Sequence, residues 1–258
     1  MGQEYTLIHI YVQAYINVLP LPVGVIKITR LPHKTGYNSL MDELSLMQRI
    51  AVWALPVLFA ITVHEVAHGW VARKLGDPTA MMLGRLTLNP LKHIDPIGTV
   101  VVPIAMLIMG GFIFGWAKPV PVTWENLRHP KRDMALVAVA GPLANLLMAI
   151  FWALVMKVGF MLGQTVDWLA WPMIYMGGAG IVINAILMLL NLLPIPPLDG
   201  GRVLAGLLPG PWAWKLSRIE PYGLIIIVLL LATGVLGQIL GPPLQAMERM
   251  MFALAGVG

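Results

Sequence analysis

The sequence predicts an all-α polytopic membrane protein: a helical bundle with one re-entrant segment and a small β-strand or loop element near a candidate metal site. Of the 258 residues, 58% are hydrophobic and only 11% are charged, whereas soluble domains carry about 25% charged residues. Long stretches of the chain contain almost no Asp, Glu, Lys or Arg. The composition therefore argues against a soluble globular enzyme and excludes an intrinsically disordered chain.

The absence of cysteine limits the chemistry that is open to the chain. With no Cys residues, there is no disulfide framework and no Cys-ligated zinc or iron–sulfur site. Any metal ion must therefore be held by His, Asp or Glu.

The uncharged stretches define the expected helices, because a membrane-spanning helix needs about 20 mainly apolar residues. The first helix is expected at 46–75, where Glu65 is the only charged residue between Arg49 and Arg73. A short helix, too short to span, is expected at 201–208. The other spans are expected between Asp95 and Lys118, between Asp133 and Lys157, between Asp167 and Asp199, and between Glu220 and Glu248, with the best helical part of the last at 222–236.

The positive charges of the loops predict how these helices are oriented. Both loops that flank the stretch 96–117 are basic, so this stretch is expected to enter the membrane from the cytoplasmic side and to return to it. The helix at 46–75 then runs the same way as the helix that precedes Asp199. We expect an N-terminal extension at 1–45, a core at 46–238 and a short C-terminal tail at 239–258.

The sequence His64-Glu65-Val66-Ala67-His68 places ionisable side chains inside an otherwise uncharged span. On a helix, residues four apart differ by about 40° of rotation, so His64 and His68 point the same way. This geometry suits two nitrogen ligands of one zinc ion, with Glu65 beside them as a general base. The alternative is a chance motif whose histidines pair with neighbouring helices, which is disfavoured because charged groups in hydrocarbon are costly.

Asp199 is the expected third ligand, because a catalytic zinc ion usually has three protein ligands and one open position. It ends the longest uncharged run of the chain, in the sequence NLLPIPPLDGG at 191–201. The prolines forbid a regular helix there, and broken backbone at membrane depth is tolerated where it lines a cavity or is buried in protein. Gly200 and Gly201 allow unusual backbone angles. The alternative is a turn in which Asp199 only caps the short helix that follows.

Three sequences together resemble the site-2 protease family of intramembrane zinc metalloproteases. They are HEVAH at 64–68, GPLAN at 141–145 and NLLPIPPLDGG at 191–201. The stretches GRLTLNPLKHIDPIGT at 84–99 and GWAKPVPV at 115–122 look like the short bacterial members of that family. The resemblance implies one zinc ion per chain, held by His64, His68 and Asp199, with Glu65 as the catalytic base.

Two asparagines are candidates for contacts with a substrate. The resemblance implies such a role for Asn191, and an interhelical hydrogen bond is the equally weighted alternative. Asn145 is the weaker candidate for substrate binding, because the small residues around it in GPLAN favour helix packing.

Two segments near the site are expected to be extended. Residues 79–89 alternate in their second half between apolar and polar side chains, which is typical of a strand. Residues 116–122 alternate prolines and valines. An edge strand beside the zinc ion could accept an unwound substrate as an added strand, and an ordinary surface loop is the alternative.

The resemblance implies a zinc metalloendopeptidase that hydrolyses membrane-spanning proteins, as a multi-pass protein of the bacterial inner membrane. The expected partners are a transmembrane protein substrate and the lipid bilayer, with no nucleic acid. A divalent-metal transporter would need polar residues along a path through both leaflets, which the later helices hardly supply. An inactive binding protein is a further alternative, but it would be expected to lack Glu65 or one ligand.

Overall fold

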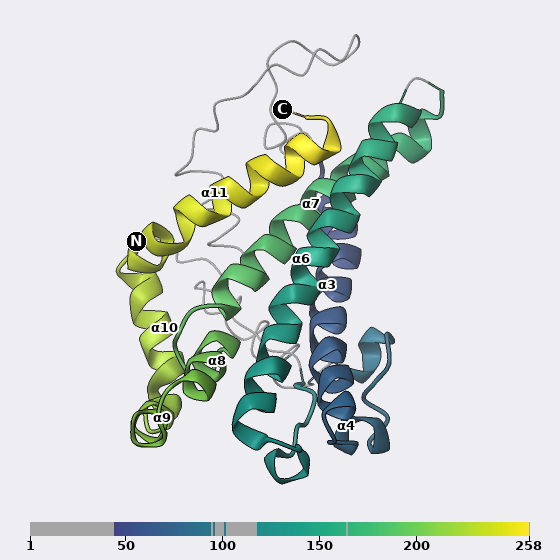
Figure 1. Ribbon diagram of the computed structural model, residues 1–258. Coiled ribbons are helices and arrows are strands. Elements are labelled where there is room, and N and C mark those ends of the chain that lie inside the picture. The colour runs from purple at the N-terminus through teal and green to yellow at the C-terminus, as the bar shows by residue number, and fades with distance from the viewer. Residues whose placement is uncertain (1–43, 94, 96–100, 102–117, 164, 258) are drawn as a thin grey trace.

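Three long helices form the framework of the molecule. The computed structural model describes residues 44–93, 95, 101, 118–163 and 165–257. The three helices lie side by side (Figure 1), and all are long and apolar enough to cross a membrane. They are α3 (Leu46–Lys74), α6 (Pro130–Leu162) and α7 (Asp167–Asn191).

The helices after α7 add a fourth potential span. They are α8 (Asp199–Leu207), α9 (Gly210–Ser217), α10 (Gly223–Ala232) and α11 (Val235–Ala255). Residues 210–232 and 235–255 form two helical stretches bent by 81°, which only together are long and apolar enough to cross a membrane. The short elements are α4 (Thr79–Met82), η1 (Pro90–Lys92), η3 (Trp124–Asn126) and η4 (Glu220–Tyr222). The chain is therefore an all-α polytopic membrane protein, as predicted.

The start of α3 agrees with the prediction because Ser45 caps the helix. The Ser45 side chain accepts a hydrogen bond from the Gln48 backbone N–H, and the Gln48 side chain accepts one from the Ser45 backbone N–H at 2.9 Å. This reciprocal capping box satisfies two donors that the first turn leaves free. At the other end, Arg73 and Lys74 lie in the last turn, where positive charge is favoured by the helix dipole.

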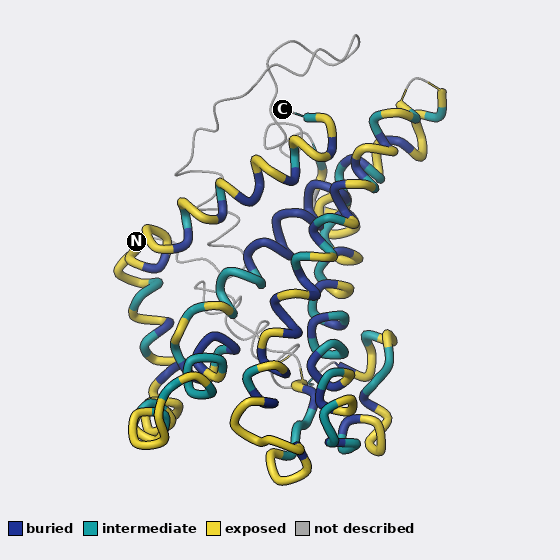
Figure 2. The backbone as a smooth tube through the Cα atoms, in the orientation of Figure 1, coloured by how far each residue is buried: buried dark blue, intermediate teal, exposed yellow. Residues whose placement is uncertain are grey.

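Small residues let α6 and α7 pack closely. A Cβ atom at Gly180 would lie 2.1 Å from the Trp152 ring, and one at Gly177 would lie 2.6 Å from the Met156 Cβ atom. The two helices thus approach more closely than any larger residue at these positions would allow. Figure 2 shows buried residues concentrated along the faces of α6 and α7 that meet.

Contacts between α3 and α6 establish their relative direction. His64 contacts Asn145, and His68, one turn later in α3, contacts Val137, which lies two turns earlier in α6. The two helices are therefore antiparallel. Because a short connection joins α6 to α7, α7 runs back alongside α6 and in the same direction as α3. This is the relation that the loop charges predict.

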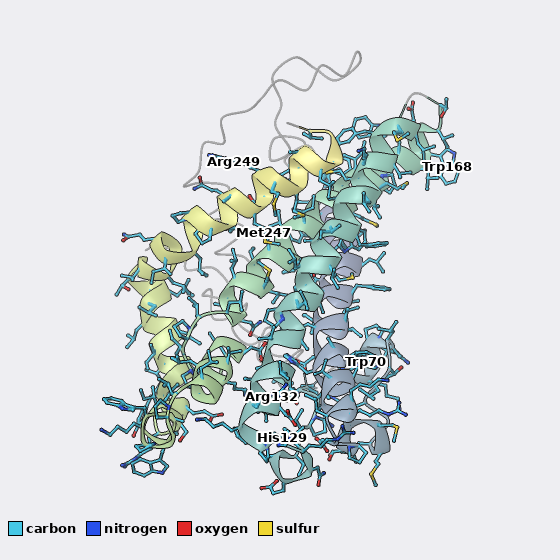
Figure 3. The ribbon with its side chains drawn as sticks, viewed as in Figure 1. Trp70, His129, Arg132, Trp168, Met247 and Arg249 are labelled. Atoms are coloured by element: carbon cyan, nitrogen blue, oxygen red, sulfur yellow. The ribbon has the colours of Figure 1, made fainter. Side chains whose placement is uncertain are left out.

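The residues that we assigned to a C-terminal tail, 239–258, lie largely within α11. Gly234 adopts a left-handed conformation with φ of 76° and separates α10 from α11. The buried face of α11 packs onto the core formed by α6 and α7. In Figure 3, Met247 lies on the side of α11 that faces the long helices and Arg249 on the outer side.

The predicted strands are not present in the described residues. Within 79–89 the chain forms α4 and then an irregular stretch, and 118–122 is also irregular. Pro119 and Pro121 have no amide to donate, and the Arg85 side chain binds the carbonyl oxygens of Lys118 and Pro119. A side chain thus takes the acceptors that a partner strand would use, so the strand prediction is wrong here.

Two further expectations concern parts of the chain outside the described residues. The re-entrant segment between Asp95 and Lys118 lies outside the described residues, apart from Val101. The N-terminal extension lies outside them up to residue 43.

A buried carboxyl group in α11 leads to a first prediction. Glu248 is 1% exposed, and neither carboxyl oxygen has a hydrogen-bond partner among the residues that the structure describes. Its neighbours on the same face, Leu244 and Met251, belong to the apolar core. A buried polar group without a partner costs about 1–3 kcal/mol, so Glu248→Met is expected to raise the free energy of unfolding by about that amount.

Denaturant titration of the protein in detergent micelles measures this effect. Glu220→Met is the matched control, because Glu220 is exposed at the start of η4 and its replacement is expected to leave stability unchanged. A loss of stability on replacing Glu248 would show that its carboxyl group is paired after all.

Candidate active site

Three potential metal ligands from distant parts of the chain meet beside α6. His64 and His68 lie on one face of α3, and Asp199 is the first residue of α8. All three are buried, with exposed fractions of 8%, 9% and 7%. The two Nε2 atoms are 3.0 Å apart, and the Asp199 Oδ2 atom lies 3.2 Å from that of His64 and 3.3 Å from that of His68. The structure thus brings together the three residues that the sequence predicts as metal ligands.

The loop between α7 and α8 brings Asp199 to the histidines. Gly200 and Gly201 fit because a Cβ atom at Gly200 would lie 2.3 Å from the Leu192 carbonyl oxygen and one at Gly201 would lie 2.4 Å from the Pro196 nitrogen. Neither glycine has a positive φ angle. The expectation of unusual backbone angles is therefore wrong, and the glycines serve close contact between α8 and the loop before it.

Hydrogen bonds on the far side of each imidazole determine which nitrogen carries the proton. The Nδ1 atom of His68 lies 2.7 Å from the Val137 carbonyl oxygen, which can only accept, so Nδ1–H donates. The Nδ1 atom of His64 lies 2.6 Å from Oδ1 of Asn145. Because the Asn145 Nδ2 group donates elsewhere, that oxygen is also an acceptor. In neutral imidazoles, both Nε2 atoms therefore present lone pairs to the site.

This donor set fits a zinc ion. When both imidazoles are neutral, two lone-pair nitrogens and a carboxylate oxygen converge at 3.0–3.3 Å, an arrangement that a cation would stabilise. Ligand atoms about 2.0 Å from a tetrahedral zinc ion are separated by about 3.3 Å, close to the observed spacing. The group formed by His64, His68 and Asp199 is also the one such cluster of His, Asp and Glu among the described residues.

Asn145 supports the site from behind and does not face it. It is completely buried, and besides contacting His64 it donates to the Ala60 carbonyl oxygen at 3.3 Å and to Oδ1 of Asn184 at 2.9 Å. A side chain enclosed in this way cannot touch a substrate, so the substrate-binding assignment is wrong. We did not single out Asn184 from the sequence, although an amide in the uncharged run of α7 was a signal for it.

Removing the Asn145 amide is expected to weaken zinc binding. In Asn145→Leu the His64 Nδ1–H group loses its acceptor, so the ring loses its fixed tautomer and orientation. Loss of such an outer contact typically costs 10- to 100-fold in metal affinity, which competition with a zinc-binding dye measures.

Asn191→Leu is the matched control for that experiment. Asn191 ends α7, and its amide donates to the Leu187 carbonyl oxygen of the same helix at 3.0 Å. Its replacement is expected to leave zinc affinity unchanged. Equal affinities for the two variants would contradict the role given to Asn145.

Glu65 lies next to the ligands in sequence and is held by the backbone of a distant segment. The Val120 N–H group donates to Oε2 of Glu65 at 2.7 Å. Neither Val120 nor the segment around it was singled out for this role from the sequence. His93 bonds through Nε2 to the Thr87 carbonyl oxygen at 2.9 Å.

A cluster of polar groups around the buried Asp77 anchors the chain after α3. Its carboxylate accepts hydrogen bonds from the Thr123 N–H at 2.7 Å, from the Asn126 amide at 3.0 Å, and from the backbone N–H and the hydroxyl of Thr79. Burial raises the pKa of Asp77, but these hydrogen bonds outweigh it and hold the pKa below its ordinary value. The cluster therefore stabilises the fold above about pH 4 and loses this contribution as the pH falls through the lowered pKa.

Gly141 of α6 faces the converging nitrogens. A Cβ atom at this position would lie 2.4 Å from the His68 Nε2 atom and 2.6 Å from that of His64. In the sequence, Gly141 is one of the small residues expected to favour helix packing, whereas in the structure its missing side chain leaves room beside both imidazoles.

Comparisons with known proteins identify relatives of this chain. The profile of Peptidase family M50 matches residues 52–170. YwhC of Bacillus subtilis, whose name includes zinc metalloprotease, is 38% identical over 211 residues, or 79% of this chain and 89% of YwhC. Rip2 of Mycobacterium tuberculosis H37Rv, named in the same way, is 30% identical over 213 residues, or 81% of this chain and 74% of Rip2.

A more distant match covers only part of the chain. The regulator of sigma-E protease RseP of Salmonella typhimurium 14028s is 32% identical over 114 residues, or 42% of this chain and 25% of RseP. No solved structure matches the chain significantly. The identity and coverage shared with YwhC and Rip2 are decisive: the chain belongs to peptidase family M50, the site-2 protease family of zinc metalloproteases.

Proposed function

We propose that this zinc metalloprotease hydrolyses peptide bonds of membrane-spanning proteins, within the inner membrane of a bacterium. The observation that carries the proposal is the position of the site. His64, Glu65 and His68 lie within a helix long and apolar enough to span the membrane, and Asp199 reaches them from the end of another. A substrate would therefore have to meet the site within the bilayer.

The residues of the site have different roles in hydrolysis. His64, His68 and Asp199 would hold the zinc ion, which when bound supplies Lewis acidity to a water molecule and to the scissile carbonyl group. Glu65 accepts a proton from the attacking water and later passes it to the leaving amine. Asn145 and the Val137 carbonyl oxygen keep both imidazoles in the tautomer that the site requires.

We further propose that Asn191 binds the substrate backbone. It lies at the end of α7, is partly exposed, and precedes the loop that leads to Asp199. Its amide nitrogen donates within the helix at 3.0 Å, which leaves its carbonyl oxygen for a substrate N–H.

Metal removal tests the proposed function. The protein is reconstituted in lipid vesicles with a test substrate, in which one transmembrane helix joins two soluble tags. Treatment with a chelator is expected to stop cleavage, and added zinc, but not magnesium, is expected to restore it. Cleavage that continues after complete removal of zinc would overturn the proposal.

A further inference from the structure

The segment 118–122 lies against α3 beside Glu65. Its sequence is Lys-Pro-Val-Pro-Val, so Val120 carries the one backbone N–H group between Lys118 and Val122. That group donates to Oε2 of Glu65 at 2.7 Å. Two prolines thus flank the N–H group that reaches the carboxylate, and they restrict the backbone on either side of it.

Gly69 allows this segment to approach the helix. It lies one turn after Glu65, and a Cβ atom there would lie 2.7 Å from Cγ1 of Val120 and 2.6 Å from Cδ2 of Leu86. The leucine methyl group is the flexible end of its side chain. The valine methyl group is attached directly to a stiff Cβ atom, so a larger residue at position 69 would displace Val120 from α3.

The Arg85 guanidinium group holds the start of the same segment. One of its nitrogens donates to the Lys118 carbonyl oxygen at 2.8 Å and, more weakly, to that of Pro119 at 3.4 Å. The other donates to the Lys92 carbonyl oxygen. The Lys118 N–H group donates to the His93 carbonyl oxygen at 2.9 Å, so the segment is fastened through both its amide and its carbonyl groups.

The far end of the segment is fastened separately. Thr123 follows it directly, and its N–H group donates to the Asp77 carboxylate at 2.7 Å. Both ends are therefore tied to buried side chains, Arg85 and Asp77. Between these two ties, the backbone has little freedom to move the Val120 N–H group away from Glu65.

We propose that the 118–122 segment is a positioning element for the catalytic base: its Val120 N–H group orients the Glu65 carboxylate, and Gly69 and Arg85 are positioning residues that keep this amide in place. The inference rests on the proposed function of Glu65 as the base. A Glu side chain has several rotatable bonds, and hydrogen bonding one oxygen orders the carboxylate while leaving the other oxygen for water. Supporting contacts of this kind are typically worth 10- to 100-fold in activity.

Amide hydrogen exchange tests the contact without any catalysis. Prolines flank Val120, so its amide is the one backbone N–H group between Lys118 and Val122. Mass spectrometry of fragments that contain this stretch therefore measures its exchange. In the full-length zinc protein, this amide is expected to exchange at least about tenfold more slowly than in Glu65→Leu, which lacks the acceptor. Equal rates in the two proteins would overturn the inference.

Steady-state kinetics with the single-span substrate test the consequence. Gly69→Ala and Arg85→Met are each expected to lower kcat by about 10- to 100-fold, with KM within about twofold and one zinc ion per chain. Both variants are also expected to lose the protection of the Val120 amide. Arg85→Lys is expected to recover only part of kcat, because an ammonium group cannot reproduce the fork of the guanidinium group. Wild-type kcat in both Gly69→Ala and Arg85→Met would overturn the inference.

Gly241→Ala is the matched control. It makes the same change in α11, where, apart from the adjacent backbone of the helix, no atom of the described residues lies within 4 Å of the added Cβ atom, and it is expected to leave kcat and Val120 exchange unchanged. Failure of the proposed function would give a different result. A wild-type protein that binds zinc but cleaves no substrate would contradict that function. The exchange rates would still show whether the Val120 N–H group donates to Glu65.

Discussion

Glu65→Gln is expected to keep one zinc ion per chain and to lose peptide-bond cleavage by about 10²- to 10⁴-fold, the usual contribution of a general base. Glutamine has the same shape as glutamate but cannot take a proton from water. The ligands His64, His68 and Asp199 are unchanged, so metal binding is expected to persist. The Gln side-chain oxygen can still accept the Val120 N–H group, which preserves the local structure.

Zinc analysis of the purified protein and cleavage of the single-span substrate measure the two parts of this prediction. Glu125→Gln is the matched control, because Glu125 lies exposed in η3 and its replacement is expected to leave both quantities unchanged. Cleavage at the wild-type rate by Glu65→Gln would contradict the role of Glu65. The same variant separates the protease from a metal transporter. If the protein were a transporter built on the same three ligands, Glu65→Gln would continue to move zinc.

The three candidate ligands could be predicted because each leaves a local signal in the sequence. The spacing of His64 and His68 follows from the period of the helix alone. Asp199 follows from the cost of a carboxylate at the end of a long apolar run interrupted by prolines. Their meeting was predicted from orientation, since the loop charges require α3 and α7 to run the same way.

Other parts of the site could not be predicted because they depend on contacts between distant segments. Gly141 looks like any small residue of a membrane helix until the imidazoles are placed against it. Val120 is apolar, and its contribution is a backbone N–H group, which every residue except proline has. Asn145 was recognised as a candidate, but only its surroundings show that it holds His64 and does not face a substrate.

The strand prediction failed for a related reason. Alternation of polar and apolar residues describes which way side chains point, but not which groups satisfy the backbone. In residues 79–93 and 118–122, the Arg85 guanidinium group and single backbone contacts satisfy carbonyl oxygens that a strand would otherwise pair. An arginine in the middle of an alternating segment is compatible with both arrangements, so the sequence alone could not separate them.

Gly141→Ala is expected to abolish stoichiometric zinc binding, and cleavage with it, although it adds a single methyl group. The added Cβ atom would lie 2.4 Å from the His68 Nε2 atom and 2.6 Å from the His64 Nε2 atom. Nitrogen ligands stand about 2.0–2.1 Å from zinc, so the methyl group would crowd the space in which the ion must sit. Both rings are fixed from behind by hydrogen bonds to Asn145 and Val137, so they cannot turn away without losing those bonds.

The same change is expected to leave the fold of α6 intact, which separates a metal-site effect from misfolding. Alanine favours a helix over glycine by about 1 kcal/mol, so the helix itself gains, and circular dichroism should show unchanged helicity. Gly237→Ala in α11 is expected to keep one zinc ion per chain, because the added Cβ atom meets no atom of the described residues within 4 Å apart from the adjacent backbone of the helix. If Gly141→Ala also bound zinc in full, the imidazoles would have to move apart on metal binding, and the site would not be formed before the ion arrives.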